Sequence, residues 1–232
     1  NALFGIAGFA GGIGFGTIFL KKGYSLQRTY ALSKLESAMM PAIQVGLLVL
    51  VVTAPAFIFF SQKGPGAMHA PWLISLAAGL VVGGLSQFSR LCTVGGFRDL
   101  FLFKKSILIF GYLAVLVGVF LVNISFGNFH LGFENQPIAH TDGLWNFLGM
   151  ALAGFCSVLL GGCPLRQLIM TGEGNSDSAV TVLGLAAGAA FAHNFGLAAS
   201  GAGPTLNGEI AVVVGFIVAL IIAVVNTKRA NA

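Results

Sequence analysis

Long runs of apolar residues, separated by short polar stretches, dominate this chain. A helix needs about 20 apolar residues to cross the hydrocarbon core of a bilayer. Runs of that length can be drawn at seven places, at residues 2–20, 42–60, 71–88, 106–125, 144–160, 178–200 and 209–226. The pattern therefore predicts an all-α membrane protein with about seven spanning helices.

The composition agrees with this interpretation and excludes two others. Hydrophobic residues make up 56% of the chain and charged residues 8%, whereas soluble domains carry about 25% charged residues. The formal net charge of +5 does not describe a nucleic-acid surface, because the basic residues fall between the apolar runs rather than along one face. We therefore expect a lipid bilayer as the surroundings and no nucleic-acid partner.

The basic residues also predict which way the chain crosses the membrane. Of the twelve Lys and Arg residues, eleven lie in segments that the seven spans place on one side, and Lys63 alone lies on the other. Basic residues are enriched in cytoplasmic loops. We therefore expect the C-terminus to be cytoplasmic and residue 1 to begin outside.

The domain organisation is predicted to be simple. No linker interrupts the apolar pattern, so we expect one transmembrane domain over residues 1–232. The chain starts at Asn1 inside an apolar run, without a basic leading segment, and we expect its native N-terminal portion to be missing. A short similarity between residues 14–23 and 154–163 suggests repeated halves, 1–70 and 71–232, with Gly23 in the place of Cys163.

The most informative interruption of the apolar pattern is Gly161-Gly162-Cys163-Pro164-Leu165-Arg166-Gln167. Proline favours the first position of a helix, so this segment predicts a loop entering a short re-entrant helix with Cys163 near its N-cap. Free amides and the positive end of the helix dipole attract anions there, and Arg166 adds a bidentate donor. The segment predicts a site for a small oxyanion; a tight helix-packing bend with a buried, inert cysteine is the alternative.

A second interruption, residues 89–99, repeats the combination of a thiol, glycines and charges. Cys92 follows a predicted span, Arg90 precedes it, and Arg98 and Asp99 follow after two glycines. Arg98 and Asp99 can pair with each other or with a substrate at the cytoplasmic mouth. The alternative is a basic anchor at the end of a span with an incidental cysteine.

Other polar positions carry weaker predictions. Cys156 lies seven residues before Cys163, on nearly the same helical face, where it either extends a row of thiols or only packs. His193 lies inside the predicted 178–200 span, where an ionisable residue is a functional candidate or a packing histidine. Ser176 or Asp177 is expected to cap the start of that span. The three cysteines lack the spacing of a zinc site, and we expect no cofactor.

The two cysteine segments, together with Gly172-Glu173-Gly174-Asn175, resemble the signature of the YeeE/YedE membrane family of sulfur-compound transporters, closest to its YedE-related selenium-metabolism branch. The resemblance covers about residues 80–226. It implies import of thiosulfate or a related sulfur or selenium anion across the plasma membrane of a prokaryote, through duplicated halves with short non-spanning helices. It assigns the substrate path to Cys163 and Cys92, and it implies a cytoplasmic TusA-like sulfur carrier as the receiver.

Three functions are compatible with the residues. In the first, a transporter without enzymatic activity uses Cys163 and Arg166 as its central contact and Cys92, Arg98 and Asp99 as its inner exit. No P-loop is present, so a gradient or trapping of the product would supply the energy. The second is a membrane sulfurtransferase that passes persulfide sulfur from a cysteine to a soluble carrier. The third is a membrane scaffold for a partner protein.

Overall fold

A computed structural model describes residues 2–26, 33–55, 70–132 and 140–230 of the chain. These residues form nine α-helices and, apart from one isolated bridge between Ser200 and Gly203, no β-structure. The helices are α1 (Ala2–Lys21), α2 (Lys34–Thr53), α3 (Trp72–Ser89), α4 (Thr93–Phe103), α5 (Ile107–Ser125), α6 (Gly143–Leu159), α7 (Pro164–Gly172), α8 (Ser176–Asn194) and α9 (Leu206–Ala230). The all-α fold expected from the sequence is confirmed.

Helical segments that suit a bilayer occur throughout the described part of the chain. Five of them are long and apolar enough to cross one: Ala2–Lys21, Trp72–Phe103, Ile107–Ser125, Gly143–Gly172 and Leu206–Thr227. They match five of the seven predicted spans, to within one residue at the starts of 71–88 and 106–125, and contain the other three in full. A sixth predicted span, 42–60, overlaps the shorter apolar stretch Pro41–Thr53 of α2, and its last residues lie outside the described part.

The seventh predicted span, 178–200, extends too far at its C-terminal end. Helix α8 stops at Asn194, and the chain then turns at Gly196, whose φ of 63° is left-handed. The hydroxyl of Thr205 donates a 2.7 Å hydrogen bond to the Gly196 carbonyl, which holds this turn against the start of α9. An apolar run alone does not show where such a turn begins.

Among the described helices, α1 and α6 make the most extensive contact. Gly8, Gly12 and Gly16 lie on one face of α1, and a side chain at any of them would collide with α6. Gly8 meets Phe147, Gly12 meets Ala151 and Gly16 meets Val158, so the two helices run parallel. Small residues at such spacing permit the close backbone approach by which helices associate in a membrane.

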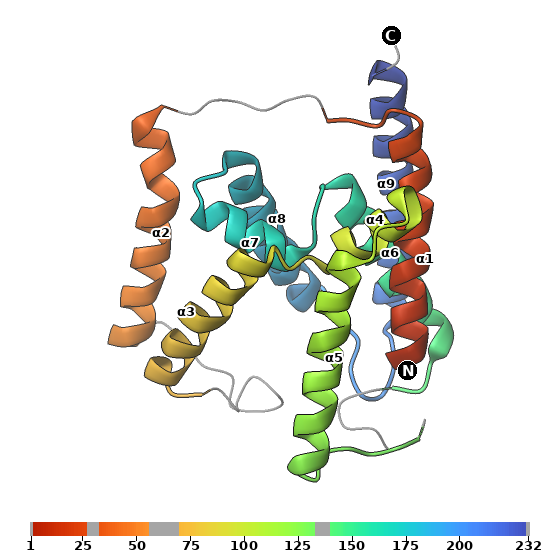
Figure 1. Ribbon diagram of the computed structural model, residues 1–232. Helices are drawn as coiled ribbons and strands as arrows, with labels where there is room; N and C mark the ends of the chain where they lie inside the picture. The colour runs from red at the N-terminus through yellow and green to blue at the C-terminus, as the bar shows by residue number, and fades with distance from the viewer. Residues whose placement is uncertain (1, 27–32, 56–69, 133–139, 231–232) are drawn as a thin grey trace.

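Helices α4 and α7 are too short to span a bilayer, with 11 and 9 residues. Each follows a longer helix after a tight turn: α4 follows α3, and α7 follows α6. Figure 1 shows both short helices in the middle of the molecule, while the N-terminus and the C-terminus lie at opposite ends. The predicted half-helices are thus present, and they occupy the centre.

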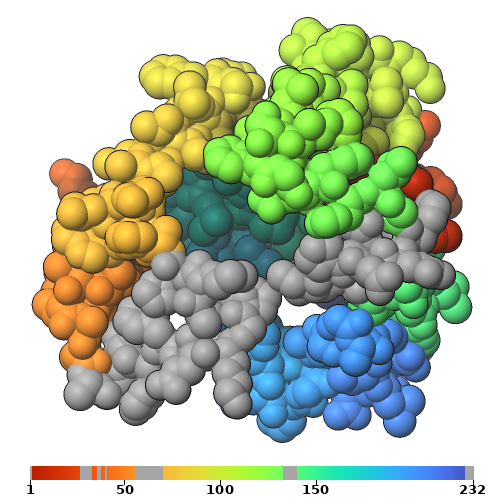
Figure 2. Space-filling view, turned by 90° about the horizontal axis from the view of Figure 1, so that it is seen from below, coloured from red at the N-terminus to blue at the C-terminus, as the bar shows by residue number. Residues whose placement is uncertain are grey.

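The outer helices expose large apolar side chains, as expected of a surface that faces lipid. No residue of α5 is buried, and Ser86 is the one buried residue of α3. Viewed from the end of the molecule that carries the N-terminus, the surface has a recess between α3 and α5, with the region of α7 and α8 at its floor (Figure 2). The region of α7 is therefore approached from that side through this recess.

Candidate functional site: a pair of thiols between two helix N-termini

Cys92 and Cys163 follow two turns that have the same hydrogen-bond pattern. The Arg90 amide donates to the Gln87 carbonyl and the Leu91 amide to the Ser86 carbonyl. In the second turn, the Gly161 amide donates to the Val158 carbonyl and the Gly162 amide to the Ser157 carbonyl. Arg90 and Gly161 are left-handed, with φ of 51° and 84°, and the cysteine comes two residues later in each turn. Bonds of this kind satisfy the last carbonyls of a helix and redirect the chain.

A third turn of this kind ends α1 and corrects the alignment of the first half. The Gly23 amide donates to Leu20 and the Tyr24 amide to Phe19, and Gly23 has a φ of 86°. Gly23 therefore corresponds to Gly161, not to Cys163 as the sequence similarity suggested. The residue two positions after Gly23 is Ser25. A hydroxyl therefore lies at the position where the other two turns carry a thiol.

Both cysteines are the N-cap residues of their short helices. Cys163 precedes Pro164, which takes the first helical position as predicted. Cys92 caps α4 by accepting a 3.2 Å hydrogen bond from the Gly95 amide at its Sγ atom. The two N-termini meet, and the Cys92 and Cys163 thiols lie side by side in one buried cluster. Neither thiol is part of a disulfide.

The sulfur of Cys163 lies near polar groups in the first turns of both short helices. The backbone N–H of Arg166 in α7, and the backbone N–H and hydroxyl of Thr93 in α4, lie near this sulfur, although the side chain of Cys163 accepts no capping hydrogen bond. These amides belong to the first turns of two helices, where the helix dipole is positive. The arrangement stabilises negative charge at this position, whether the charge belongs to a Cys163 thiolate or to an anion bound beside it.

Apolar side chains enclose the thiol pair. Cys163 is 3% exposed and Cys92 is 8% exposed, and both pack with Ile13, Val94 and Val158. Around this cluster lie Phe9, Leu20, Phe97, Phe101 and Leu165. The sulfur atoms are closed off in this conformation, with polar contacts supplied by the two helix N-termini.

Two of the glycines beside the thiols are closely packed. A Cβ at Gly95 would lie 3.3 Å from Cys92 Sγ and 3.2 Å from a methyl of Leu108, and one at Gly96 would lie 3.2 Å from the backbone of Ile109. Gly161 is favoured by its left-handed backbone, whereas a Cβ at Gly162 would make only ordinary contacts. The glycines thus set the spacing around the pair.

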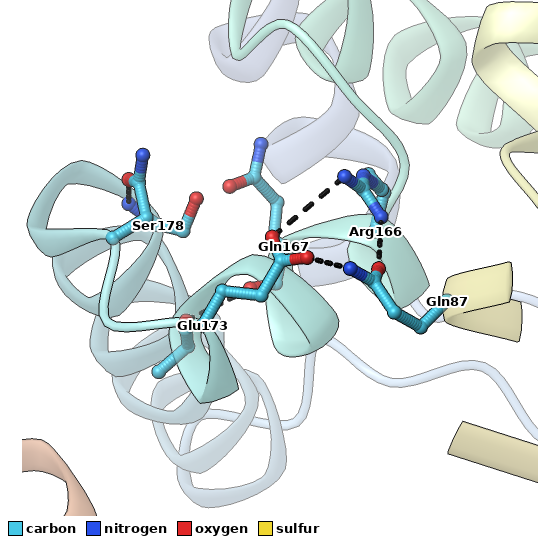
Figure 3. Close-up of polar contacts among 7 residues, drawn as sticks. Gln87, Arg166, Gln167, Glu173 and Ser178 are labelled. Atoms are coloured by element: carbon cyan, nitrogen blue, oxygen red, sulfur yellow. Dashed lines mark hydrogen bonds and ion pairs between the residues drawn. The ribbon is translucent and has the colours of Figure 1, made fainter. Parts of the chain in front are cut away.

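The guanidinium of Arg166 bonds to side chains rather than to the thiols. Its Nη1 donates a 2.8 Å hydrogen bond to Gln87 Oε1 at the end of α3, and its Nη2 lies 3.7 Å from Glu173 Oε2. Gln87 in turn donates through Nε2 to Glu173 Oε1. Figure 3 shows these three side chains converging from α3 and from the two ends of α7.

The charged residues of the second interruption lie on the edges of the site. Arg98 and Asp99 bind each other, with a 2.9 Å contact between Nη2 and Oδ1, so the first of the two expected pairings is the one formed. Arg90 is exposed in its left-handed turn.

Two candidates from the sequence lie away from the thiol pair. Cys156 packs with a separate cluster around Phe155 and Ala219 and lines an apolar groove of about 650 Å³ beside α9. His193 is exposed in the last turn of α8, at the opposite end of a 19-residue helix from the turn that joins α8 to α7. At 1.5 Å per residue this is roughly 25 Å along the helix.

The start of α8 differs from the prediction. Asn175, rather than Ser176 or Asp177, is the N-cap, and its side chain accepts a 2.9 Å hydrogen bond from the Ser178 amide. Gly174 is left-handed and forces the chain to leave α7 first, so the helix can begin only after it.

Sequence reasoning missed Thr93, Gln87 and Glu173 as parts of the site. The signal for Thr93 was its place directly after a cysteine that caps a helix. Nothing local marked Gln87, because its role depends on the tertiary approach of α3 to α7.

Within the described residues, no group of three or more His, Cys, Asp or Glu side chains is arranged to hold a metal ion. A sequence model of the sulphur transport family matches residues 88–231, which include both short helices and both thiols. No curated protein and no solved structure matches the chain.

Proposed function

The chain belongs to the sulphur transport family. From this premise we propose that it imports a small dianion that contains sulfur or selenium, such as thiosulfate. The path of this anion passes between Cys92 and Cys163. As a member of this family it is a membrane transporter of sulfur compounds. The proposed identity of the anion and its proposed route both rest on the geometry of the thiol pair.

The convergence of two helix N-termini on one sulfur is the observation that carries the proposal. Backbone amides of Thr93 and Arg166, the Thr93 hydroxyl and the Cys92 thiol all lie near Cys163 Sγ. A dianion that replaces this sulfur among the donors would find the same contacts. The apolar walls exclude water, which strengthens each of these electrostatic interactions.

The buried state of the thiols corresponds, in this proposal, to the closed form of the path. The recess on the N-terminal side reaches the region of α7 and α8 (Figure 2). An anion would enter there and pass the thiol pair when the two short helices separate. The basic residues gathered toward the other side would receive it in the cytoplasm, where a TusA-like carrier would accept its sulfur.

The test is uptake of radiolabelled thiosulfate into proteoliposomes that contain the full chain and no soluble carrier. We expect saturable uptake, with thiosulfate and selenium oxyanions competing according to their affinity. Absence of uptake for every sulfur or selenium anion tried would contradict the proposal.

A sulfurtransferase is a second candidate, because the donors around Cys163 also favour a nucleophilic thiolate. In that reaction the Cys163 thiolate attacks the outer sulfur of thiosulfate, the S–S bond breaks, and sulfite leaves with the bonding electron pair. The product is a Cys163 persulfide. Intact-protein mass spectrometry separates the two functions, since a stable gain of one sulfur without uptake would favour transfer over transport.

A further inference from the structure

The hydrogen-bonded ring of Gln87, Arg166 and Glu173 connects α3 to both ends of α7 (Figure 3). Arg166 and Glu173 lie seven residues apart, which places them on one face of α7 two turns apart. Gln87 bonds to both of them at once. Because Ser86 is the one buried residue of α3, this ring is a principal attachment of the end of α3 to α7.

The same residues hold the two thiols through their backbones. The Gln87 carbonyl accepts the Arg90 amide in the turn that leads to Cys92. Arg166 lies in the first turn of α7, whose N-cap residue is Cys163. Movement of Gln87 relative to Arg166 would therefore move one cysteine segment relative to the other.

The opposite charges of Arg166 and Glu173 form only a long, partly exposed ion pair. The guanidinium of Arg166 lies 3.7 Å from a single oxygen of Glu173, and their side chains are 23% and 39% exposed. A guanidinium forms shorter, bidentate hydrogen bonds with a planar or tetrahedral oxyanion. A dianion that arrives at Arg166 can therefore compete with Glu173 for the same donors.

We infer that Gln87 and Glu173 are positioning residues of a latch, which keeps the Cys92–Cys163 contact closed and which a divalent oxyanion opens by taking the place of Glu173 at Arg166. This inference rests on the proposed function for the identity of the anion. Glu173 acts as a displaceable counter-ion, and Gln87 transmits its release to α3.

The closure of the latch is tested by amide hydrogen exchange of the full chain in lipid nanodiscs, without thiosulfate. Gln87→Leu removes both bonds of the central residue while keeping a helix-forming side chain of similar size. We expect exchange at least about tenfold faster in the segments 86–96 and 161–170, since even one of the two lost bonds to a charged group is worth about that factor. Unchanged exchange in α1 and α6 would show that the fold is intact.

The role of Glu173 is tested by equilibrium binding of radiolabelled thiosulfate in the same nanodiscs. Glu173→Gln removes the competing charge, and we expect thiosulfate to bind about tenfold more tightly. The matched control is Asp177→Asn, which removes the same charge from an exposed residue in the first turn of α8. This control should leave the affinity as in the wild type.

Two results would overturn the latch: exchange in Gln87→Leu within twofold of the wild type, or an equal gain in affinity in Glu173→Gln and Asp177→Asn. Failure of the proposed function gives a different result. A wild-type protein that binds thiosulfate and shows both variant effects, but transports no anion, would disprove import while the latch stands.

Discussion

Gly12 of α1 and Ala151 of α6 approach so closely that no side chain fits between them. The next residue along α1, Ile13, is fully buried against Cys92 and Cys163. The glycine face of α1 therefore brings a wall of the thiol site into position. Close packing of these two helices is a condition for the site as well as for the fold.

Replacement of Gly12 by valine should destabilise the protein. The new side chain would collide with the α6 backbone, and overpacking of this kind costs about 1–3 kcal/mol. The thermal midpoint in detergent should fall. It is measured as the amount of folded protein that remains in size-exclusion chromatography after heating. Gly118→Val in α5 is the control, since nothing lies within 4 Å of a Cβ at Gly118; an equal fall in both variants would mean that the α1–α6 contact is not the cause.

Replacement of Gly95 by alanine should impair uptake more than stability. The added methyl would press on Cys92 Sγ and Leu108, while alanine is a better helix former than glycine by about 1 kcal/mol. We expect a thermal midpoint close to that of the wild type, with thiosulfate uptake reduced by about tenfold or more. Unimpaired uptake in this variant would show that the spacing of Cys92 is not critical.

The left-handed turns predict opposite effects at two equivalent positions. Gly161→Ala should destabilise the protein by roughly 1–2 kcal/mol, because a side chain is unfavourable at its φ of 84°. Arg90→Gly should raise stability by about 1 kcal/mol, since Arg90 already bears that strain. Chemical denaturation measures both. Loss of stability in Arg90→Gly would indicate that the Arg90 side chain has a structural role of its own.

Much of the fold follows from local pattern, and so does one half of the site. Apolar runs place most of the helices, and the Cys163-Pro164 pair places the start of α7, because proline at the first helical position is a local signal. The end of α8 was less accurate, since the turn at Gly196 interrupts a run that reads as continuous.

The meeting of Cys92 and Cys163 could not be predicted from the sequence alone. It depends on how α3 and α6 direct their short helices toward each other, which is a tertiary relationship. The same is true of Arg166: its charge near Cys163 was visible, but its partners Gln87 and Glu173 come from a different helix and from the far end of its own. Gly23 was misaligned because similarity of letters does not reveal which residue is left-handed.

The orientation of the chain, the repeated halves 1–70 and 71–232 and the carrier protein stay predictions. The three similar turns after α1, α3 and α6 favour a duplicated design. Labelling of Lys63 by a membrane-impermeant reagent in intact cells checks the orientation. Modification of Lys63, with Lys104 and Lys105 protected, is the expected result; the reverse pattern would place the thiol side outside.

The most direct test of the account compares the three cysteines in thiosulfate uptake by proteoliposomes. Cys163→Ala and Cys92→Ala should each abolish uptake, because each removes one half of the thiol pair. Cys156→Ala, which alters a cysteine of the same helix that leads to Cys163 but packs in another cluster, should retain most of it. Uptake that survives in Cys163→Ala, or that is lost equally in all three variants, would contradict a path between Cys92 and Cys163.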